Sequence, residues 1–149
     1  MNERLDYASV SPAGLEAMRA LDRHLQRSTL GRGLIELVKV RSSQLNGCAF
    51  CIDMHTKVAR AHGETEQRLY ALSAWRETPF FDERERAALA WTEALTQIAS
   101  GVPDELYDTV RRHFDDAQLV DLTYAVAAIN SWNRVAIAFR KVPGTFKLP

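Results

Sequence analysis

The segment E-L-V-K-V-R-S-S-Q-L-N-G-C-A-F-C-I-D-M-H-T-K-V-A-R-A-H, residues 36–62, is the stretch from which both the fold and the chemistry are inferred. It contains the two cysteines of the sequence, Cys48 and Cys51, as a C-x-x-C pair. His55 follows Cys51 by four residues, and Glu36 precedes Cys48 by twelve. This spacing predicts a thiol redox centre with a histidine and a carboxylate beside it to move protons.

Helix geometry explains why these residues belong together. Asn46-Gly47 interrupts the preceding pattern, and we expect Asn46 to cap a helix that carries both cysteines in its first turns. The unpaired N–H groups and the positive dipole end of such a helix favour thiolate over thiol. At about 100° per residue, Cys48, Cys51 and His55 share one face of the helix. The sulfurs and the imidazole should therefore face the interior or a subunit contact.

The chemistry expected of this face is that of a peroxide-reducing dithiol. His55 lies one turn from Cys51 and can accept its proton, which makes a nucleophile at neutral pH. Cys48 is close enough to attack an oxidised Cys51, which releases water and forms a disulfide.

Glu36 has two interpretations at this stage. A helix from about residue 34 to residue 45 is apolar around almost its whole circumference, and Glu36 lies inside that run. The carboxylate is either an exposed residue at the edge of the helix or a desolvated functional group. The pattern of residues alone leaves both open.

Composition indicates one globular domain, residues 1–149, with 46% apolar and 26% charged residues. Lysine plus arginine equals aspartate plus glutamate at 19 each, so we expect neither a nucleic acid nor a membrane as partner. The N-terminal residues show no export signal, and we expect a cytoplasmic protein. In that compartment a C-x-x-C pair indicates redox or metal chemistry rather than a structural disulfide.

Helical periodicity runs through the chain without convincing strand alternation, which predicts an all-α bundle of about six to seven helices. Asp82 and Glu85 have the spacing of a capping box. A last helix over about residues 117–140 should be roughly 36 Å long, and it either kinks near Asn130-Ser131 or extends into a partner subunit. Its two-sided apolar character favours an oligomer. Residues 142–149 should form a docked extended tail.

Three segments match a known family. S-Q-L-N-G-C-A-F-C-I-D-M-H-T-K (43–57), A-W-R-E-T-P-F-F (74–81) and R-A-A-L-A-W-T-E-A-L-T (86–96) resemble the carboxymuconolactone decarboxylase superfamily. Their closer resemblance is to its AhpD-like alkylhydroperoxidase branch. The resemblance extends over about residues 34–139 and includes the specific spacing E-x11-C-x2-C-x3-H.

The resemblance implies an all-α homo-oligomer, a trimer or a hexamer built from trimers, that reduces organic hydroperoxides through a dithiol. It implies that Cys51 attacks the peroxide, that Cys48 resolves the oxidised sulfur, and that Glu36 and His55 form a proton relay, with no cofactor or metal. An external dithiol, of lipoyl or thioredoxin-like type, would restore the reduced protein. One departure is Phe50, where the best-known members have a histidine, so rate, peroxide preference or reductant could differ.

Other functions remain open. Cys48, Cys51 and His55, with Glu36 as a fourth ligand, could hold zinc. The pair could also exchange disulfides in other proteins without peroxidase activity, or sense oxidants. Lactone decarboxylation is a further alternative, but the true decarboxylases lack the C-x-x-C pair, so its presence here favours thiol chemistry. Phe50, Tyr124 and Trp132 are candidates for the pocket wall, although core packing is the simpler explanation for each of them.

Overall fold

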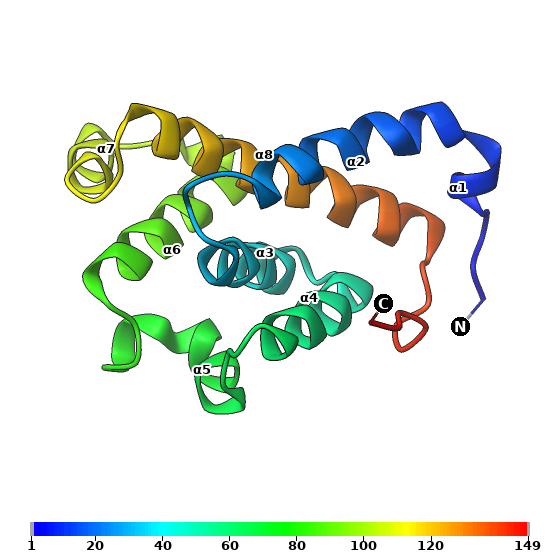
Figure 1. The fold of residues 1–149 in the computed structure, drawn as a ribbon, viewed down its shortest axis with the longest axis horizontal. Helices are drawn as coiled ribbons and strands as arrows, with labels where there is room; N and C mark the ends of the chain where they lie inside the picture. The colour runs from blue at the N-terminus through cyan, green and yellow to red at the C-terminus, as the bar shows by residue number, and fades with distance from the viewer. Residues whose placement is uncertain (1, 149) are drawn as a thin grey trace.

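The computed structural model describes residues 2–148, and this part of the chain contains helices and no strands (Figure 1). The all-α prediction is confirmed. The elements in chain order are α1 Tyr7–Val10, α2 Pro12–Gln26, α3 Arg32–Asn46, α4 Ala49–Ala61, α5 Glu66–Ala71, the 3-10 helix η1 Leu72–Glu77, α6 Glu83–Thr96, the 3-10 helix η2 Ile98–Ser100, α7 Asp104–Arg111 and α8 Asp116–Phe139. The short helix α1 was not predicted, and the capping box of Asp82 and Glu85 at the start of α6 is confirmed.

Helix α3 lies at the centre of the fold and packs against α4, α6 and α8 (Figure 1). Every residue from 34 to 40 is buried, including the charged Glu36 and Lys39. Each charge has a partner on another helix: Glu36 pairs with His55 of α4, and Lys39 pairs with Asp22 of α2. Because a buried charge without a partner is costly, these two pairs fix how α4 and α2 lie against α3.

The junction between α3 and α4 differs from the prediction. Asn46 does not cap α4, because it is the last residue of α3. Gly47 follows with a φ of 69°, and the N–H of Cys48 donates to the carbonyl of Ser43 at 3.0 Å. A left-handed glycine of this kind ends a helix and satisfies its last carbonyls. Helix α3 therefore ends later than expected, and Cys48 takes the N-cap position of α4.

The side chain of Asn46 instead joins a polar network that fastens α8 to α3. Its Nδ2 donates to Oδ1 of Asn130 at 3.0 Å and to Oδ1 of Asn133 at 2.9 Å. Asn133 donates in turn to Ser43 Oγ, and Asn130 donates to Ser42 Oγ, each at 3.0 Å. Since the buried amide of Asn133 and the half-buried amides of Asn46 and Asn130 are hydrogen-bonded across the interface, these polar residues cost little at the edge of the core.

Helix α8 is continuous over 24 residues, so the kink considered near Asn130-Ser131 is not found. Its surface is apolar on both sides: Ala128 and Ile129 are buried, whereas Val120, Tyr124 and Ile137 are exposed. The predicted oligomer stays a prediction. Among residues 2–148, no helix combines the length and the apolar character needed to cross a membrane.

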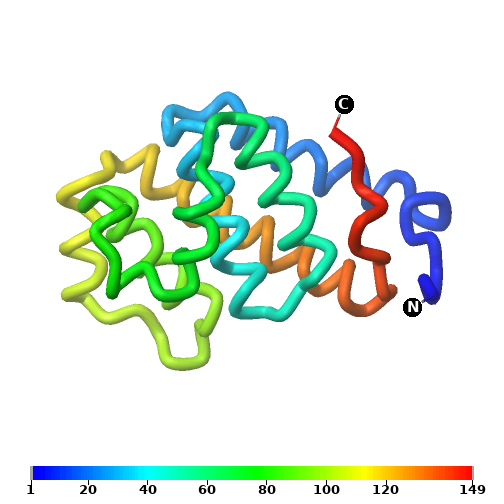
Figure 2. The backbone as a smooth tube through the Cα atoms, turned by 90° about the horizontal axis from the view of Figure 1, so that it is seen from below, coloured from blue at the N-terminus to red at the C-terminus, as the bar shows by residue number. Residues whose placement is uncertain are grey.

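Both ends of the described chain lie at the same end of the molecule, beside the end of α8 (Figures 1 and 2). The N–H of Arg4 donates to the carbonyl of Phe139 at 2.9 Å, and Glu3 pairs with Lys141 at 3.0 Å. The tail lies against α4, where the N–H of Gly144 donates to Asp53 Oδ2 at 3.0 Å. The expected docked tail is confirmed for residues 142–148, and Pro149 lies outside the described residues.

We predict that Gly47→Ala lowers the free energy of unfolding by about 1 kcal/mol, because a Cβ is disfavoured at a left-handed φ. No neighbouring atom lies within 4 Å of the added Cβ, so the loss would come from the backbone alone. The matched control is Gly33→Ala in the same helix, which also has open space and has no left-handed φ. It should raise stability by about 0.5–1 kcal/mol. Urea denaturation measures both, and equal changes in the two variants would contradict this account.

Candidate active site

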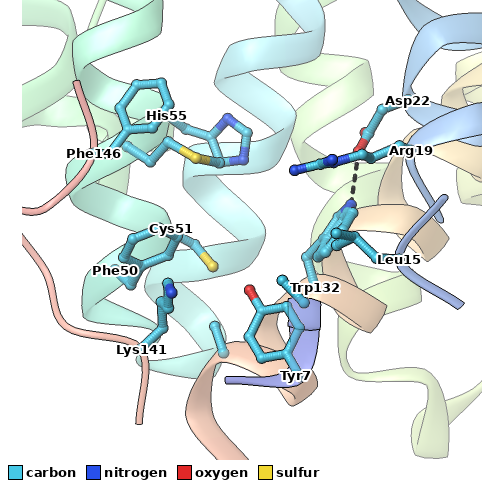
Figure 3. A pocket seen from close by; sticks show the side chains of 13 residues that line it. Tyr7, Leu15, Arg19, Asp22, Phe50, Cys51, His55, Trp132, Lys141 and Phe146 are labelled. Carbon is cyan, nitrogen blue, oxygen red and sulfur yellow. Dashed lines mark hydrogen bonds between the residues drawn. The ribbon is translucent and has the colours of Figure 1, made fainter. Parts of the chain in front are cut away.

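A cavity of about 350 Å³ lies beside the C-x-x-C segment (Figure 3). Cys51 and His55 of α4 form part of its wall, whereas Cys48 lies behind it. Most of the remaining wall is apolar and comes from α1, α2, α4, α8 and the tail: Ala8, Leu15, Phe50, Met54, Trp132, Ala136 and Phe146. The other polar residues of the wall are Tyr7, Arg19, Asp22 and Lys141. The cavity therefore offers a small organic molecule a mainly apolar surface with one sulfur, one imidazole and a few other polar groups.

The two cysteines are not joined by a disulfide, and their sulfurs are in contact. Their Sγ atoms are 2.7 Å apart, which is longer than a disulfide bond of about 2.05 Å. Each residue is 2% exposed, and both pack against Ile129 and Ala136 of α8. The pair needs only a small movement of one sulfur to close a disulfide.

The contact between the two sulfurs shifts their pKa values in opposite directions. The pKa of Cys48 is lowered to about 7, chiefly because the Cys51 thiol donates a hydrogen bond to its sulfur. Backbone N–H groups of Phe50 and Cys51 and the amide of Asn133 add to this effect, as expected at a helix N-cap. The same contact with Cys48, together with burial, raises the pKa of Cys51. These directions favour Cys48 as the thiolate predicted at the start of α4, and Cys51, which faces the cavity, as the sulfur that keeps its proton.

Glu36 and His55 form a buried pair, of which His55 lines the cavity and Glu36 does not. His55 Nδ1 donates to Glu36 Oε2 at 2.8 Å, and the two residues are 5% and 7% exposed. The interpretation of Glu36 as an exposed edge residue is therefore wrong. Since the carboxylate holds the proton on Nδ1, a neutral His55 keeps Nε2 as an acceptor.

No hydrogen bond joins His55 to either sulfur in the described part of the chain, although Cys51 and His55 line the same cavity. A proton can pass between them through a water or a substrate molecule in the cavity. The four residues predicted from the sequence are thus brought together, but as two hydrogen-bonded pairs, Cys48–Cys51 and Glu36–His55, rather than as one continuous chain.

Sequence reasoning missed several residues that shape the site. Asp22 accepts hydrogen bonds from Lys39 at 2.9 Å and from Trp132 Nε1 at 2.7 Å, which holds the indole in the cavity wall. Asn133 is fully buried beside the two sulfurs. Its signal in the sequence is the pair of asparagines three residues apart in an otherwise apolar helix, since a buried amide needs a partner. Asp22 carries no such signal.

The three proposed wall residues have different fates. Phe50 and Trp132 line the cavity, whereas Tyr124 is 48% exposed elsewhere on α8.

The zinc alternative requires Cys48, Cys51, His55 and Glu36 to converge on one point. Within residues 2–148, no three or more His, Cys, Asp and Glu side chains form a group with the arrangement of a metal site.

Comparison with solved structures identifies the fold as AhpD-like. ATU0492 from Agrobacterium tumefaciens is a protein of unknown function whose description proposes that it is the antioxidant defence protein AhpD. It is 44% identical and superposes with a TM-score of 0.93, covering 97% of this chain and 100% of that one. The debrominase Bmp8 is 20% identical, with a TM-score of 0.83 over 92% of this chain and 74% of its own, and it shares the fold alone.

The sequence comparisons agree with this assignment. The family model of the carboxymuconolactone decarboxylase family matches residues 12–94. The uncharacterized protein YdfG of Bacillus subtilis (strain 168) is 50% identical over 139 residues, which is 93% of this chain and 95% of YdfG. This chain therefore belongs to the carboxymuconolactone decarboxylase family, in its AhpD-like branch.

We predict that the reduced protein gains one thiolate per chain as the pH rises through about 7, the value to which the pKa of Cys48 is lowered. Below that pH both sulfurs are protonated, and above it Cys48 is ionised while Cys51 keeps its proton. Thiolate absorbance at 240 nm, recorded against pH, measures the midpoint and the number of thiolates.

The single-cysteine variants provide the control. In Cys51→Ala, the midpoint for Cys48 should move upward because the hydrogen bond from Cys51 is lost. In Cys48→Ala, the remaining Cys51 should lose the contact that raises its pKa most. Two thiolates titrating together in the unmodified protein would contradict the assignment.

Proposed function

We propose that this protein is a thiol-dependent peroxidase that reduces organic hydroperoxides through Cys48 and Cys51. The observation that carries the proposal is the contact of two sulfurs without a disulfide bond, 2.7 Å apart, one of which lines a mainly apolar cavity together with His55. Membership of the AhpD-like branch supports the same class of chemistry. An apolar wall suits the alkyl group of an organic hydroperoxide better than a strongly hydrated substrate.

Cys51 is the attacking residue in this proposal, because it faces the cavity and Cys48 does not. Before the reaction, the negative charge lies on Cys48. When the proton of Cys51 moves to Cys48 across their contact, Cys51 becomes the thiolate. The Cys51 thiolate then attacks the terminal peroxide oxygen: an S–O bond forms, the O–O bond breaks, and an alkoxide leaves. Two electrons pass from the sulfur to the peroxide, which leaves a sulfenic acid on Cys51.

The second step closes the disulfide. Cys48, now a thiol, condenses with the sulfenic acid on Cys51, so that an S–S bond forms and water leaves. An external dithiol then returns the pair to the reduced state. Because both cysteines are 2% exposed, a slender lipoyl arm that enters the cavity reaches them more readily than a thioredoxin-like protein does. The same burial argues against a disulfide reductase acting on folded proteins.

In this proposal, the pair of Glu36 and His55 stores the proton that Cys48 loses when the resting thiolate forms. The carboxylate fixes the imidazole by accepting from Nδ1, and it stabilises the positive charge of the ring when Nε2 takes up a proton. After the O–O bond breaks, the stored proton returns to the cavity to neutralise the alkoxide. Both residues therefore serve proton transfer in this proposal, and neither forms a bond to the substrate.

We predict that the protein consumes tert-butyl hydroperoxide with dihydrolipoamide as reductant, and that Cys51→Ser abolishes turnover. Cys48→Ser should stop after one attack and leave a sulfenic acid on Cys51 that dimedone traps. Peroxide consumption by Cys51→Ser with Cys48 intact would mean that the two roles are reversed. Stoichiometric oxidation of the unmodified protein without turnover would instead indicate an oxidant sensor.

We predict that Glu36→Gln lowers kcat/KM for the hydroperoxide by about 100-fold, because the amide cannot stabilise an imidazolium. Glutamine can still accept a hydrogen bond from His55, so the variant should fold. The matched control is Glu66→Gln, which removes a carboxylate of an exposed ion pair with Arg60 and should leave kcat/KM unchanged. Steady-state kinetics together with circular dichroism distinguishes loss of proton transfer from loss of structure, and full activity of Glu36→Gln would make the carboxylate a bystander.

A further inference from the structure

Tyr7 lies in the cavity wall opposite the C-x-x-C segment, and neither the sequence pattern nor the region matched by the family model includes it. Its hydroxyl points toward the Cys51 sulfur across the cavity (Figure 3). Within the described chain this hydroxyl has no hydrogen-bond partner. Among the other polar side chains of the wall, Asp22, Lys141 and His55 are bonded to other side chains, whereas Arg19 has no such bond within residues 2–148. Tyr7 is thus a donor aimed at the place where a peroxide must lie.

The position of Tyr7 is fixed by contacts of its ring and of its segment. The ring packs against Phe139 of α8, with centroids 5.8 Å apart, and the ammonium group of Lys141 lies 5.7 Å from the ring centroid. Arg4 bonds to the carbonyl of Phe139, and Asp6 caps α1. The hydroxyl is therefore held by packing that does not involve the oxygen itself, so its removal should leave the ring in place.

The electrostatic environment keeps this hydroxyl protonated. Burial is the main cause that raises the pKa of Tyr7. The positive charges of the nearby Lys141 and Arg19 act in the opposite direction. A phenol in this state is a neutral donor at physiological pH. Phe50, which belongs to the C-x-x-C segment and lines the same cavity, presents no donor.

We propose that Tyr7 is a further catalytic residue that donates its phenolic proton to the alkoxide released from the hydroperoxide. This inference rests on the peroxidase function proposed above. As Cys51 attacks the terminal oxygen, the O–O bond breaks and the departing oxygen takes the Tyr7 proton, which gives the alcohol and a phenolate. This proton transfer is downhill, because an alkoxide is a much stronger base than the tyrosine phenolate. The phenol of tyrosine has an ordinary pKa of about 10. The Tyr7 phenolate recovers the proton stored on His55 through water in the cavity, and Lys141 stabilises it meanwhile.

The test uses the leaving group. Tyr7→Phe keeps the ring and removes the donor, so kcat/KM for tert-butyl hydroperoxide should fall by about 100-fold. Peracetic acid releases a carboxylate, whose conjugate acid has a pKa of about 4, and it needs no proton donor. Tyr7→Phe should therefore react with the peracid at close to the wild-type rate. Single-turnover oxidation of the reduced protein measures the rates with the hydroperoxide and with the peracid without involving the reductant. The rate of Cys51→Ser is subtracted as the background.

Tyr70→Phe is the matched control, since Tyr70 is 72% exposed and lines none of the cavities described. It should behave as the wild type with both oxidants. Equal losses for the two oxidants in Tyr7→Phe would show a merely structural role, and no loss for either would also overturn the inference, while in both cases the proposed peroxidase function stands. If the wild type itself fails to react with the hydroperoxide, the proposed function falls, which is a distinct result.

Discussion

The pairing of buried charges on α3 is the constraint on which the rest of the structure depends. This helix is covered on every side, yet it carries Glu36 and Lys39 inside its buried run. Breaking a buried pair typically costs about 3–5 kcal/mol, so each charge requires a partner from a neighbouring helix. His55 pairs with Glu36 and thereby orients α4. Asp22 pairs with Lys39 and also accepts a hydrogen bond from Trp132, which holds the indole in the cavity wall. The interactions that assemble the core therefore also build the site.

The C-x-x-C segment meets two opposed demands. The contact between the sulfurs lowers the pKa of Cys48, and the same contact together with burial raises the pKa of Cys51. A substrate nevertheless needs access to one sulfur. The chain resolves this by placing Cys51 at a cavity whose walls include α1 and the C-terminal tail, two segments far apart in the sequence that lie at the same end of the molecule (Figure 2). The termini thus contribute to the reaction space as well as to packing.

Much of the fold could be predicted from the sequence because it depends on local periodicity. The order of the main helices, the capping box of Asp82 and Glu85 and the buried character of α3 all follow from residue spacing. The N-cap of α4 was placed wrongly because Asn46 is equally suited to capping and to buried hydrogen bonding. Its partners, Asn130 and Asn133, lie more than eighty residues away, and no local pattern shows that they face Asn46.

The sequence by itself determined which chemistry-bearing residues share a face, since the i, i+4 spacing of Cys51 and His55 fixes their direction in any helix. The tertiary structure decided which way Glu36 points, which sulfur meets the cavity, and that Tyr7 lies opposite Cys51. The physical reason is that a helix fixes the relative directions of its own side chains. Contacts between helices depend instead on how buried charges and amides find partners across the whole core.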